Sequence, residues 1–367
     1  MEVFCGSLYR NISEVINGIN IHRCLTKDPY TFQKDCLGIF EQRHLLKKFD
    51  IIESPEIHGN VIEIKKKFPE LPLIIRLHMP LFIQMRLNNF YTTRLTKLRF
   101  FLGGLRRGKI NFLGHYNYKK DVDYNITAIA DGVVSPSEAM KEIIIKEWKI
   151  SFDKIIVIPN PYVPSQVLLN INNKSLQKNR ILFIGKLNVH KGIVNLVKVI
   201  PFVVKKYPDV VFILVGNDSY FATKKMNMSA YVQQQLKGYE KNYTITGGLE
   251  YAEVVRQLTD CSLCIFPSIW ECFGMVCLEA MSAGRPIIGS SRGGMSDILT
   301  NAGELADPHN VMQMANDVIK LLGDHKLREY YAKKGREKVL SEYSPEIIGR
   351  QIEEYYQEVI NKNSSVF

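Results

Sequence analysis

The sequence lacks several features that would decide its class at once. None of its apolar runs approaches the length that a helix needs to cross a lipid bilayer, which argues against helical membrane spans. It has no internal repeat and no low-complexity segment, so solenoid and fibrous architectures are excluded as well. No signal peptide opens the 367 residues. We therefore expect a cytoplasmic protein, or one docked on the inner face of the cytoplasmic membrane.

Cysteine is present, but its pattern indicates neither disulfides nor a metal. The seven cysteines are an odd number, which fits reduced thiols in a chain without a secretory signal. Cys261 and Cys264 could begin a zinc knuckle with Cys272 and Cys277, but the first pair lies in or beside an apolar strand. Since buried free cysteine behaves as a small hydrophobic residue, no metal site is expected.

Length and periodicity together predict two α/β domains. Short apolar runs alternate with segments of helical spacing, which is typical of a parallel, doubly wound sheet. The strands expected in the first half are Met1–Cys5, Gly18–Cys24, Phe49–Glu53, Leu73–Leu77, Asp131–Val134 and Ile155–Ile158. Those expected in the second half are Ile181–Gly185, Val210–Gly216, Tyr243–Thr246, Ser262–Phe266, Pro286–Gly289 and Glu304–Ala306. A helix over Ser137–Trp148 would have Ser137 as its N-cap.

One strand, turn and helix carry the residues of a ligand site. The apolar strand Ser262–Phe266 leads into a turn with Glu271, and a helix then places Glu279 about two helical turns further on. The N–H groups at the start of that helix would form its free, positive end, which suits a phosphate: Phe273, Gly274 and Met275. A carboxylate at the turn can accept hydrogen bonds from sugar hydroxyls. The alternative is a surface helix with two solvated glutamates.

The residues around this turn carry a family resemblance. The segment Pro267–Asp297 resembles the E-x7-E signature of glycosyltransferase family 4, the retaining enzymes of GT-B fold. Gly185-Lys186-Leu187 followed by Lys191-Gly192 resembles the phosphate-binding motif of the same family, and Gly293-Gly294 matches a third landmark. Three landmarks in the family's order and spacing are a specific signal. The resemblance covers nearly the whole C-terminal half and is weaker, though visible, in the N-terminal half.

The resemblance implies an α/β fold with two Rossmann-like, doubly wound domains that face each other across a cleft. Residues 1–160 would bind the acceptor, residues 161–343 would bind the nucleotide sugar, and residues 344–367 would form a helix that crosses back to the first domain. Family members open with a strand, a glycine-rich loop and a helix before a strand like Glu2–Cys5. We therefore expect the N-terminal domain to lack its first strand and helix.

The resemblance also assigns roles to particular residues. The donor would be held by Gly185, Lys186, Lys191, Glu271, Phe273, Gly274, Met275 and Glu279. In this set the two lysines would meet the departing diphosphate, Glu271 the transferred sugar and Glu279 the ribose. His78 resembles the histidine that points at the donor sugar, so the expected catalytic residues are His78, Lys186, Lys191 and Glu271. Glu56 and His58, in the loop after the preceding strand, are weaker candidates for acceptor contacts.

The net charge of +11 indicates that the protein binds anionic partners. No motif that reads nucleic acid is present, so nucleic acid is not expected as a partner. Sugar nucleotides are one candidate, and an anionic membrane surface is the other. The segment Leu81–Ile110 has basic residues interleaved with apolar ones and no acidic residue, a composition that suits an amphipathic helix lying on an anionic bilayer. The alternative is a core helix with a solvated basic face.

The resemblance implies a retaining hexosyltransferase. It would move a sugar from a UDP-, GDP- or ADP-sugar to a polysaccharide or lipid-linked acceptor in cell-surface glycan synthesis, of which lipopolysaccharide is one product. No metal or other cofactor is required in this picture. A sugar-nucleotide epimerase of GT-B fold and a truncated, non-catalytic nucleotide-sugar-binding protein are the alternatives. The sequence does not specify the sugar, the nucleotide or the acceptor.

Overall fold

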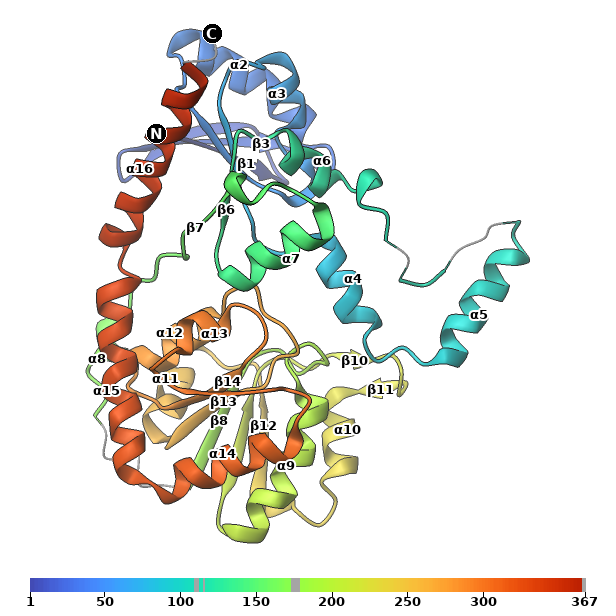
Figure 1. The fold of residues 1–367 in the computed structure, drawn as a ribbon, viewed down its shortest axis with the longest axis vertical. Coiled ribbons are helices and arrows are strands. Elements are labelled where there is room, and N and C mark those ends of the chain that lie inside the picture. Colours follow the sequence, from blue (N-terminus) through green and yellow to red (C-terminus); the bar gives the residue numbers. More distant parts are fainter. Residues whose placement is uncertain (109–111, 115, 173–178, 365–367) are drawn as a thin grey trace.

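The computed structural model describes residues 1–108, 112–114, 116–172 and 179–364. Two α/β halves are stacked along the long axis of the molecule (Figure 1). The chain passes from the first half to the second after strand β7 (Ile155–Val157). It returns along one side of the molecule through helices α15 (His325–Glu342) and α16 (Pro345–Ser364).

The strands of the first half form two separate sheets. Three strands pair in the order β1-β3-β2, and four parallel strands pair in the order β4-β5-β6-β7. Their bounds are β1 Glu2–Ser7, β2 Ile12–Ile16, β3 Ile19–Leu25, β4 Ile52–Pro55, β5 Leu73–Arg76, β6 Gly132–Ser135 and β7 Ile155–Val157. The six strands predicted for this half are all present.

Within the first half, strand β2 was not predicted from sequence periodicity. It pairs antiparallel with β3, and the turn between them is Asn17-Gly18. Both turn residues have positive φ, 51° and 77°, as a two-residue hairpin of type I′ requires. Most residues of β2 are exposed, so no buried run marks the strand. The Asn-Gly pair was the signal that could have revealed it.

Seven helices of the described part of the first half cover the four-stranded sheet or extend from it. Their bounds are α1 Phe32–Asp35, α2 Leu37–Leu46, α3 Ile62–Lys67, α4 Leu81–Asn89, α5 Arg94–Leu105, α6 Val122–Ile129 and α7 Glu138–Trp148. The hydroxyl oxygen of Ser137 accepts a hydrogen bond from Met140 N at 3.2 Å, which confirms the predicted N-cap of α7.

A cavity of about 1140 Å³ lies between β1 and β4, each of which is an edge strand of its sheet. Helices α1 to α3 and Tyr356 of α16 complete its lining. The cavity separates the two N-terminal sheets. Its lining includes His58, a candidate for acceptor contacts, but none of the residues that the sequence predicts for donor binding or catalysis.

The second half is built on one six-stranded parallel sheet in the order β12-β9-β8-β13-β14-β15. The strands are β8 Arg180–Ile184, β9 Val211–Val215, β12 Tyr243–Gly247, β13 Leu263–Phe266, β14 Ile287–Ser290 and β15 Glu304–Ala306, so the six predicted strands are all present. A small hairpin of β10 (Tyr220–Phe221) and β11 (Met226–Asn227) lies outside this sheet. The central strands are apolar throughout because helices cover both faces of the sheet.

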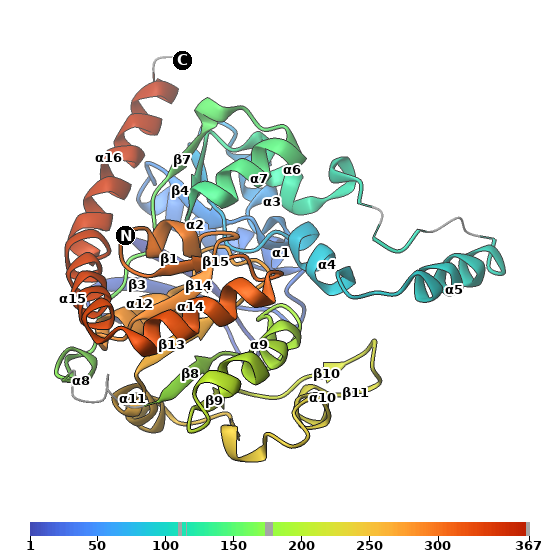
Figure 2. The same cartoon turned by 60° about the horizontal axis from the view of Figure 1, so that its bottom comes forward.

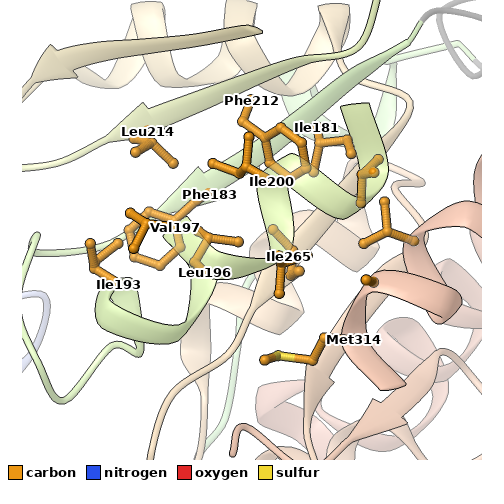
Figure 3. Close-up of a cluster of buried hydrophobic side chains, with 14 of the residues drawn as sticks. Ile181, Phe183, Ile193, Leu196, Val197, Ile200, Phe212, Leu214, Ile265 and Met314 are labelled. Atoms are coloured by element: carbon orange, nitrogen blue, oxygen red, sulfur yellow. The ribbon is translucent and has the colours of Figure 1, made fainter. Parts of the chain in front are cut away.

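Two clusters of buried side chains fill the space between this sheet and its helices. One face packs against α9 (Ile193–Lys206), α10 (Met228–Gln235) and α14 (Val311–Gly323). The other face packs against α11 (Tyr251–Asp260), α12 (Met275–Ser282), α13 (Met295–Leu299) and α15. Along α9, the apolar residues recur every three or four positions and meet Phe183 and Phe212 of the sheet (Figure 3).

Helices α4 and α5 reach out of the first half. Helix α4 ends at the second half, where the Phe90 ring stacks on His309 at 5.0 Å and the Tyr91 carbonyl accepts a hydrogen bond from Thr223 at 3.2 Å. Helix α5 then projects away from both halves (Figures 1 and 2). Lys109 and Ile110, the end of the predicted basic segment, lie outside the described residues. Within the described residues, the helices do not combine the length and the apolar character of a membrane span.

Helix α16 packs on the first half. Its buried residues Ile348, Tyr355 and Val359 form a cluster with Ile74 and Val134 of the four-stranded sheet. The last helix therefore shares a core with the residues of the first half, far from it in sequence.

Candidate functional site

The predicted ligand residues follow strands that are neighbours in the C-terminal sheet. Lys186, Glu271 and Gly293 come directly or shortly after β8, β13 and β14, and Asn217 follows the neighbouring strand β9. These four strands are adjacent and parallel, so their carboxyl ends meet at one edge. Ligands of open α/β sheets bind at this edge. The structure thus brings together the loops that the sequence predicts.

Glu271 forms an ion pair with Lys191, as Nζ of Lys191 donates to Oε1 of Glu271. The same carboxylate oxygen accepts a hydrogen bond from the hydroxyl of Ser268 at 2.9 Å. The Glu271 side chain is 14% exposed and the Lys191 side chain 32%. The two charges are therefore partly shielded from solvent but still reachable by a ligand.

The loop between β8 and α9 is fastened to the segment before Glu271. The side-chain oxygen of Asn188 accepts a hydrogen bond from Lys191 N at 2.9 Å, and His190 O accepts one from Ile269 N at 2.8 Å. Gly192 has φ +77°, and a Cβ there would lie 1.8 Å from Pro267 O. Only glycine fits this close approach. Lys186, on the same loop, is exposed.

Helix α12 begins at Met275, close to the predicted position, and Gly274 is its N-cap with φ +119°. The Phe273 ring is buried and packs against Tyr343 at 5.9 Å, so this residue offers its backbone and not its ring. The first N–H groups of a helix have no intrahelical acceptor and carry partial positive charge. This end of α12 directly follows the Glu271 turn.

The loop after β14 closes on the same turn. Gly294 N donates to Glu271 O at 2.8 Å, and a Cβ on Gly293 would lie 2.1 Å from that oxygen. The glycine pair therefore allows two backbones to touch. Glu279, on α12, is half-buried, and burial raises its pKa.

His78 follows β5 in the first half and lies at the junction of the two halves. Its Nδ1 is 3.0 Å from Arg76 O, and its side chain is 48% exposed. The neighbouring Met79 Sδ is 3.3 Å from the sulfur of Cys272, the residue after Glu271. The His78 segment and the Glu271 turn are therefore in contact.

Further contacts between the halves surround this point. Ser137 Oγ donates to Cys272 O at 2.6 Å, and Glu138 N donates to Asp297 Oδ2 at 2.7 Å. Ile269 is buried in the core of the first half. From the sequence, Ser137 was predicted only as a helix cap, and Ser268 and Asp297 were not predicted as site residues. Nothing in the local sequence pattern of these three residues indicates their contacts with remote segments.

Glu56 and His58, the weaker candidates for acceptor contacts, lie in different environments. Glu56 was considered for acceptor contacts, but it is 0% exposed and accepts hydrogen bonds from backbone N–H groups, so it cannot touch an acceptor. The His58 ring packs against the Tyr30 ring at an interplanar angle of 57° with centroids 4.2 Å apart, and its contact with an acceptor stays a prediction.

In the described residues, no group of three or more His, Cys, Asp or Glu side chains is placed to hold a metal ion. Cys261 Sγ and Cys264 Sγ are 4.0 Å apart and buried. Cys264 belongs to β13 and Cys261 lies two residues before this strand, and both pack with apolar residues in the core.

Comparison with solved structures shows the fold. Sucrose-phosphate synthase from Thermosynechococcus elongatus matches with a TM-score of 0.70 at 19% identity, covering 98% of this chain and 89% of that one. The Anabaena protein HepE, solved with UDP and glucose, matches with a TM-score of 0.65 at 18% identity, covering 93% and 87%. The chain thus has the GT-B fold, with two Rossmann-like parallel sheets.

Sequence comparison shows the relatives. An uncharacterised glycosyltransferase of Methanocaldococcus jannaschii is 26% identical over 64% of this chain and 62% of its own length. A lipopolysaccharide 1,2-N-acetylglucosaminetransferase of Salmonella typhimurium is 25% identical over 63% of each chain. These matches therefore span less than two thirds of the relatives. The model for glycosyl transferases group 1 matches residues 166–338 and that for glycosyltransferase family 4 matches residues 1–166, and the chain belongs to glycosyltransferase family 4.

Proposed function

We propose that this protein is a retaining hexosyltransferase that uses a nucleoside-diphosphate sugar such as a UDP-, GDP- or ADP-sugar. The acceptor is a glycan or a lipid-linked sugar in cell-surface glycan synthesis. The observation that carries the proposal is the ion pair of Lys191 with Glu271 at the carboxyl edge of the sheet, beside the start of α12. Family membership, and the UDP and glucose seen with the Anabaena protein, support it.

The geometry suggests which residues would bind each part of a nucleotide sugar. A diphosphate is drawn to the Lys191 and Lys186 cations and to the free N–H groups of α12. When phosphate oxygens take Lys191, the Glu271 carboxylate is released to accept hydrogen bonds from the transferred sugar. Glu279, on the same helix, is assigned to the ribose. Stabilising the leaving phosphate would be the main source of rate, since preorganised charge is usually the largest catalytic effect.

The acceptor side of the reaction belongs to the first half in this proposal. Residues 1–160 bind the acceptor, residues 161–343 bind the donor, and residues 344–367 tie the second half back to the first. His78 reaches the donor sugar from the acceptor side. Retention follows from attack on the face that the phosphate leaves, with that phosphate taking the proton of the acceptor hydroxyl.

Helix α5 is the proposed contact with an anionic membrane surface, which would place the protein on the inner face of the cytoplasmic membrane. Four leucines share one side of this helix and are 45% to 56% exposed: Leu95, Leu98, Leu102 and Leu105. Exposed cations flank them, among them Arg94, Lys97 and Arg99. A helix with this pattern lies in the lipid interface with its apolar side down.

The test is transfer by the purified full chain, with labelled UDP-, GDP- and ADP-sugars and lipid-linked acceptors, and with the anomer of the product read by NMR. Lys191→Ala should lower kcat by about 100-fold or more, because it removes charge from the leaving group. The matched control is Lys198→Ala, an exposed lysine of α9, the helix that follows the Lys191 loop, which should leave kcat unchanged. Unchanged turnover in Lys191→Ala would refute the phosphate role. A new sugar epimer formed from the donor alone would identify an epimerase instead.

A further inference from the structure

Glu56 has a buried carboxylate group. The side-chain hydrogen bonds described for it come from His78 and Met79, in the loop that follows β5. Glu56 is 0% exposed. Both of its oxygens lie 3.0 Å from His78 N, and Oε1 accepts a second hydrogen bond from Met79 N at 2.8 Å. Hydrogen bonds to a charged acceptor are strong, and a buried charge is tolerated only when it is satisfied in this way. The carboxylate therefore fixes the backbone at positions 78 and 79.

The strand register explains why Glu56 reaches this segment. β4 and β5 are parallel, and Pro55 lies opposite Arg76. Glu56 follows Pro55 directly, so it stands beside the residues that leave the end of β5. The loops after two neighbouring strands are thus joined by one side chain.

A second buried acid makes a similar connection nearby and provides a comparison. Asp123 of α6 accepts hydrogen bonds from His58 N and Leu81 N, both at 3.0 Å. It braces the same two loops, but it bonds neither His78 nor Met79 among the contacts described. Glu56 alone of the two lies beside the imidazole, with 3.8 Å between His78 Nδ1 and Oε2.

The environment of the imidazole selects which nitrogen faces outward. Arg76 O lies 3.0 Å from Nδ1, so a proton on Nδ1 is held by this carbonyl and by the nearby carboxylate. Nε2 is then the nitrogen available to a ligand. Glu56 raises the pKa of His78, which favours the cation. Burial and the charge of the Arg76 guanidinium lower the pKa of His78, whereas the hydrogen bond to the Arg76 carbonyl raises it. Asp123 and Cys272 are titratable groups that interact with Glu56.

We propose that Glu56 is a positioning residue for the transfer reaction, which directs the His78 imidazole and holds Met79 against Cys272 beside Glu271. This rests on the proposed function, because it assumes that His78 faces the donor sugar. The carboxylate itself touches neither donor nor acceptor. Glu56 acts across the junction of the two halves, because Met79, which it fixes, contacts Cys272 in the Glu271 turn.

The experiment compares Glu56→Gln with Asp123→Asn, which removes an equivalent buried charge. Glu56→Gln should lower the pKa of His78, followed by NMR of histidine-labelled protein, and should lower kcat at least tenfold with the donor KM within twofold. Asp123→Asn should leave the pKa of His78 near its wild-type value, whatever it does to the Tm. In a His78→Ala background, Glu56→Gln should reduce kcat by a smaller factor than in the wild type, because the part of its effect that passes through the imidazole is already lost.

A pKa of His78 that does not move in Glu56→Gln would overturn the proposal, as would full additivity of the two substitutions. If Glu56→Gln does not fold, Glu56→Asp gives the same comparison, since its shorter side chain keeps the charge but withdraws it from the imidazole. The NMR measurement needs no turnover. A wild-type protein without transferase activity would therefore refute the proposed function and still leave the positioning of His78 by Glu56 tested.

Discussion

Lys191 and Glu271 stand 80 residues apart in the sequence and form an ion pair at the edge of the C-terminal sheet. Each comes from a different strand–helix loop, and a backbone hydrogen bond from Ile269 N to His190 O joins the two loops. In this arrangement the cation assigned to the phosphate is neutralised by the acid assigned to the sugar. A donor must therefore exchange partners with this pair when it binds.

Replacing Glu271 by Gln should separate phosphate binding from catalysis. Without the carboxylate, Lys191 keeps its full charge, so UDP should bind a few-fold more tightly in calorimetry. Transfer should fall by about 100-fold, because the sugar loses a charged hydrogen-bond acceptor in the transition state.

The control for this substitution is Glu304→Gln, which breaks the ion pair with Lys320 on the surface and should change neither quantity. Weaker UDP binding in Glu271→Gln would contradict the exchange of partners. It would mean that Glu271 holds Lys191 in place for the phosphate instead of competing with it.

Gly192→Ala should displace the phosphate loop. The added Cβ would lie 1.8 Å from Pro267 O, and φ of +77° is unfavourable for alanine. Overpacking and backbone strain each cost about 1–3 kcal/mol, so the Tm should fall by several degrees and UDP affinity should fall with it.

The matched substitution is Gly349→Ala, at an exposed position on α16 where a Cβ would meet nothing within 4 Å. It should raise stability by about 0.5–1 kcal/mol, since alanine is the better helix former. Equal Tm values for the two variants would show that the backbone at Pro267 can move away from the added Cβ at little cost in stability.

The parts of this molecule that could be predicted are those with a local or periodic signal. The buried strands are apolar runs, and parallel strands place their carboxyl ends together, so the edge that carries Lys191 and Glu271 followed from the sequence. The start of α12 near Gly274 followed in the same way.

The parts that could not be predicted depend on tertiary contacts. Glu56 looked like an exposed loop acid, because nothing local shows that the N–H groups of His78 and Met79 surround it. The second hydrogen bond of Ser137, to Cys272, joins residues 135 positions apart. Strand β2 was missed for a different reason, since one face of it is exposed and the Asn-Gly turn was overlooked.

Helix α5 should bind vesicles that contain anionic lipid. Leu98→Glu places a charge in the middle of its exposed apolar side, so binding to vesicles with phosphatidylglycerol should fall at least tenfold in sedimentation assays. Binding of the wild-type chain should also weaken with salt, because each cation near the surface contributes about 1 kcal/mol.

The control is Leu340→Glu, which changes a leucine of similar exposure, 49%, on α15 of the second half. It should leave vesicle binding unaltered. Loss of binding in both variants would show that general hydrophobicity, and not the α5 surface, causes the binding. If the wild-type chain bound neutral vesicles as strongly as anionic ones, the basic residues of α5 would have no role in binding.

Glu279→Gln should stabilise the protein at neutral pH while impairing donor binding. Burial raises the pKa of Glu279, so the folded chain binds this proton more tightly than the unfolded chain does. The associated stability is present below the unfolded pKa and is lost as the pH rises through the folded pKa. At pH 7 the ionised carboxylate therefore lowers the free energy of unfolding, and the glutamine variant avoids that cost.

The Tm of Glu279→Gln should thus exceed that of the wild type at pH 7, and the difference should shrink towards pH 4, near the usual pKa of glutamate. UDP affinity should fall about tenfold, because a hydrogen bond between a carboxylate and the ribose is worth more than one to an amide. Glu353→Gln, on the exposed side of α16, should change neither measurement. A lower Tm for Glu279→Gln at pH 7 would show that a partner stabilises the ionised carboxylate in the folded chain, and would remove the argument that the acid is kept for the ligand.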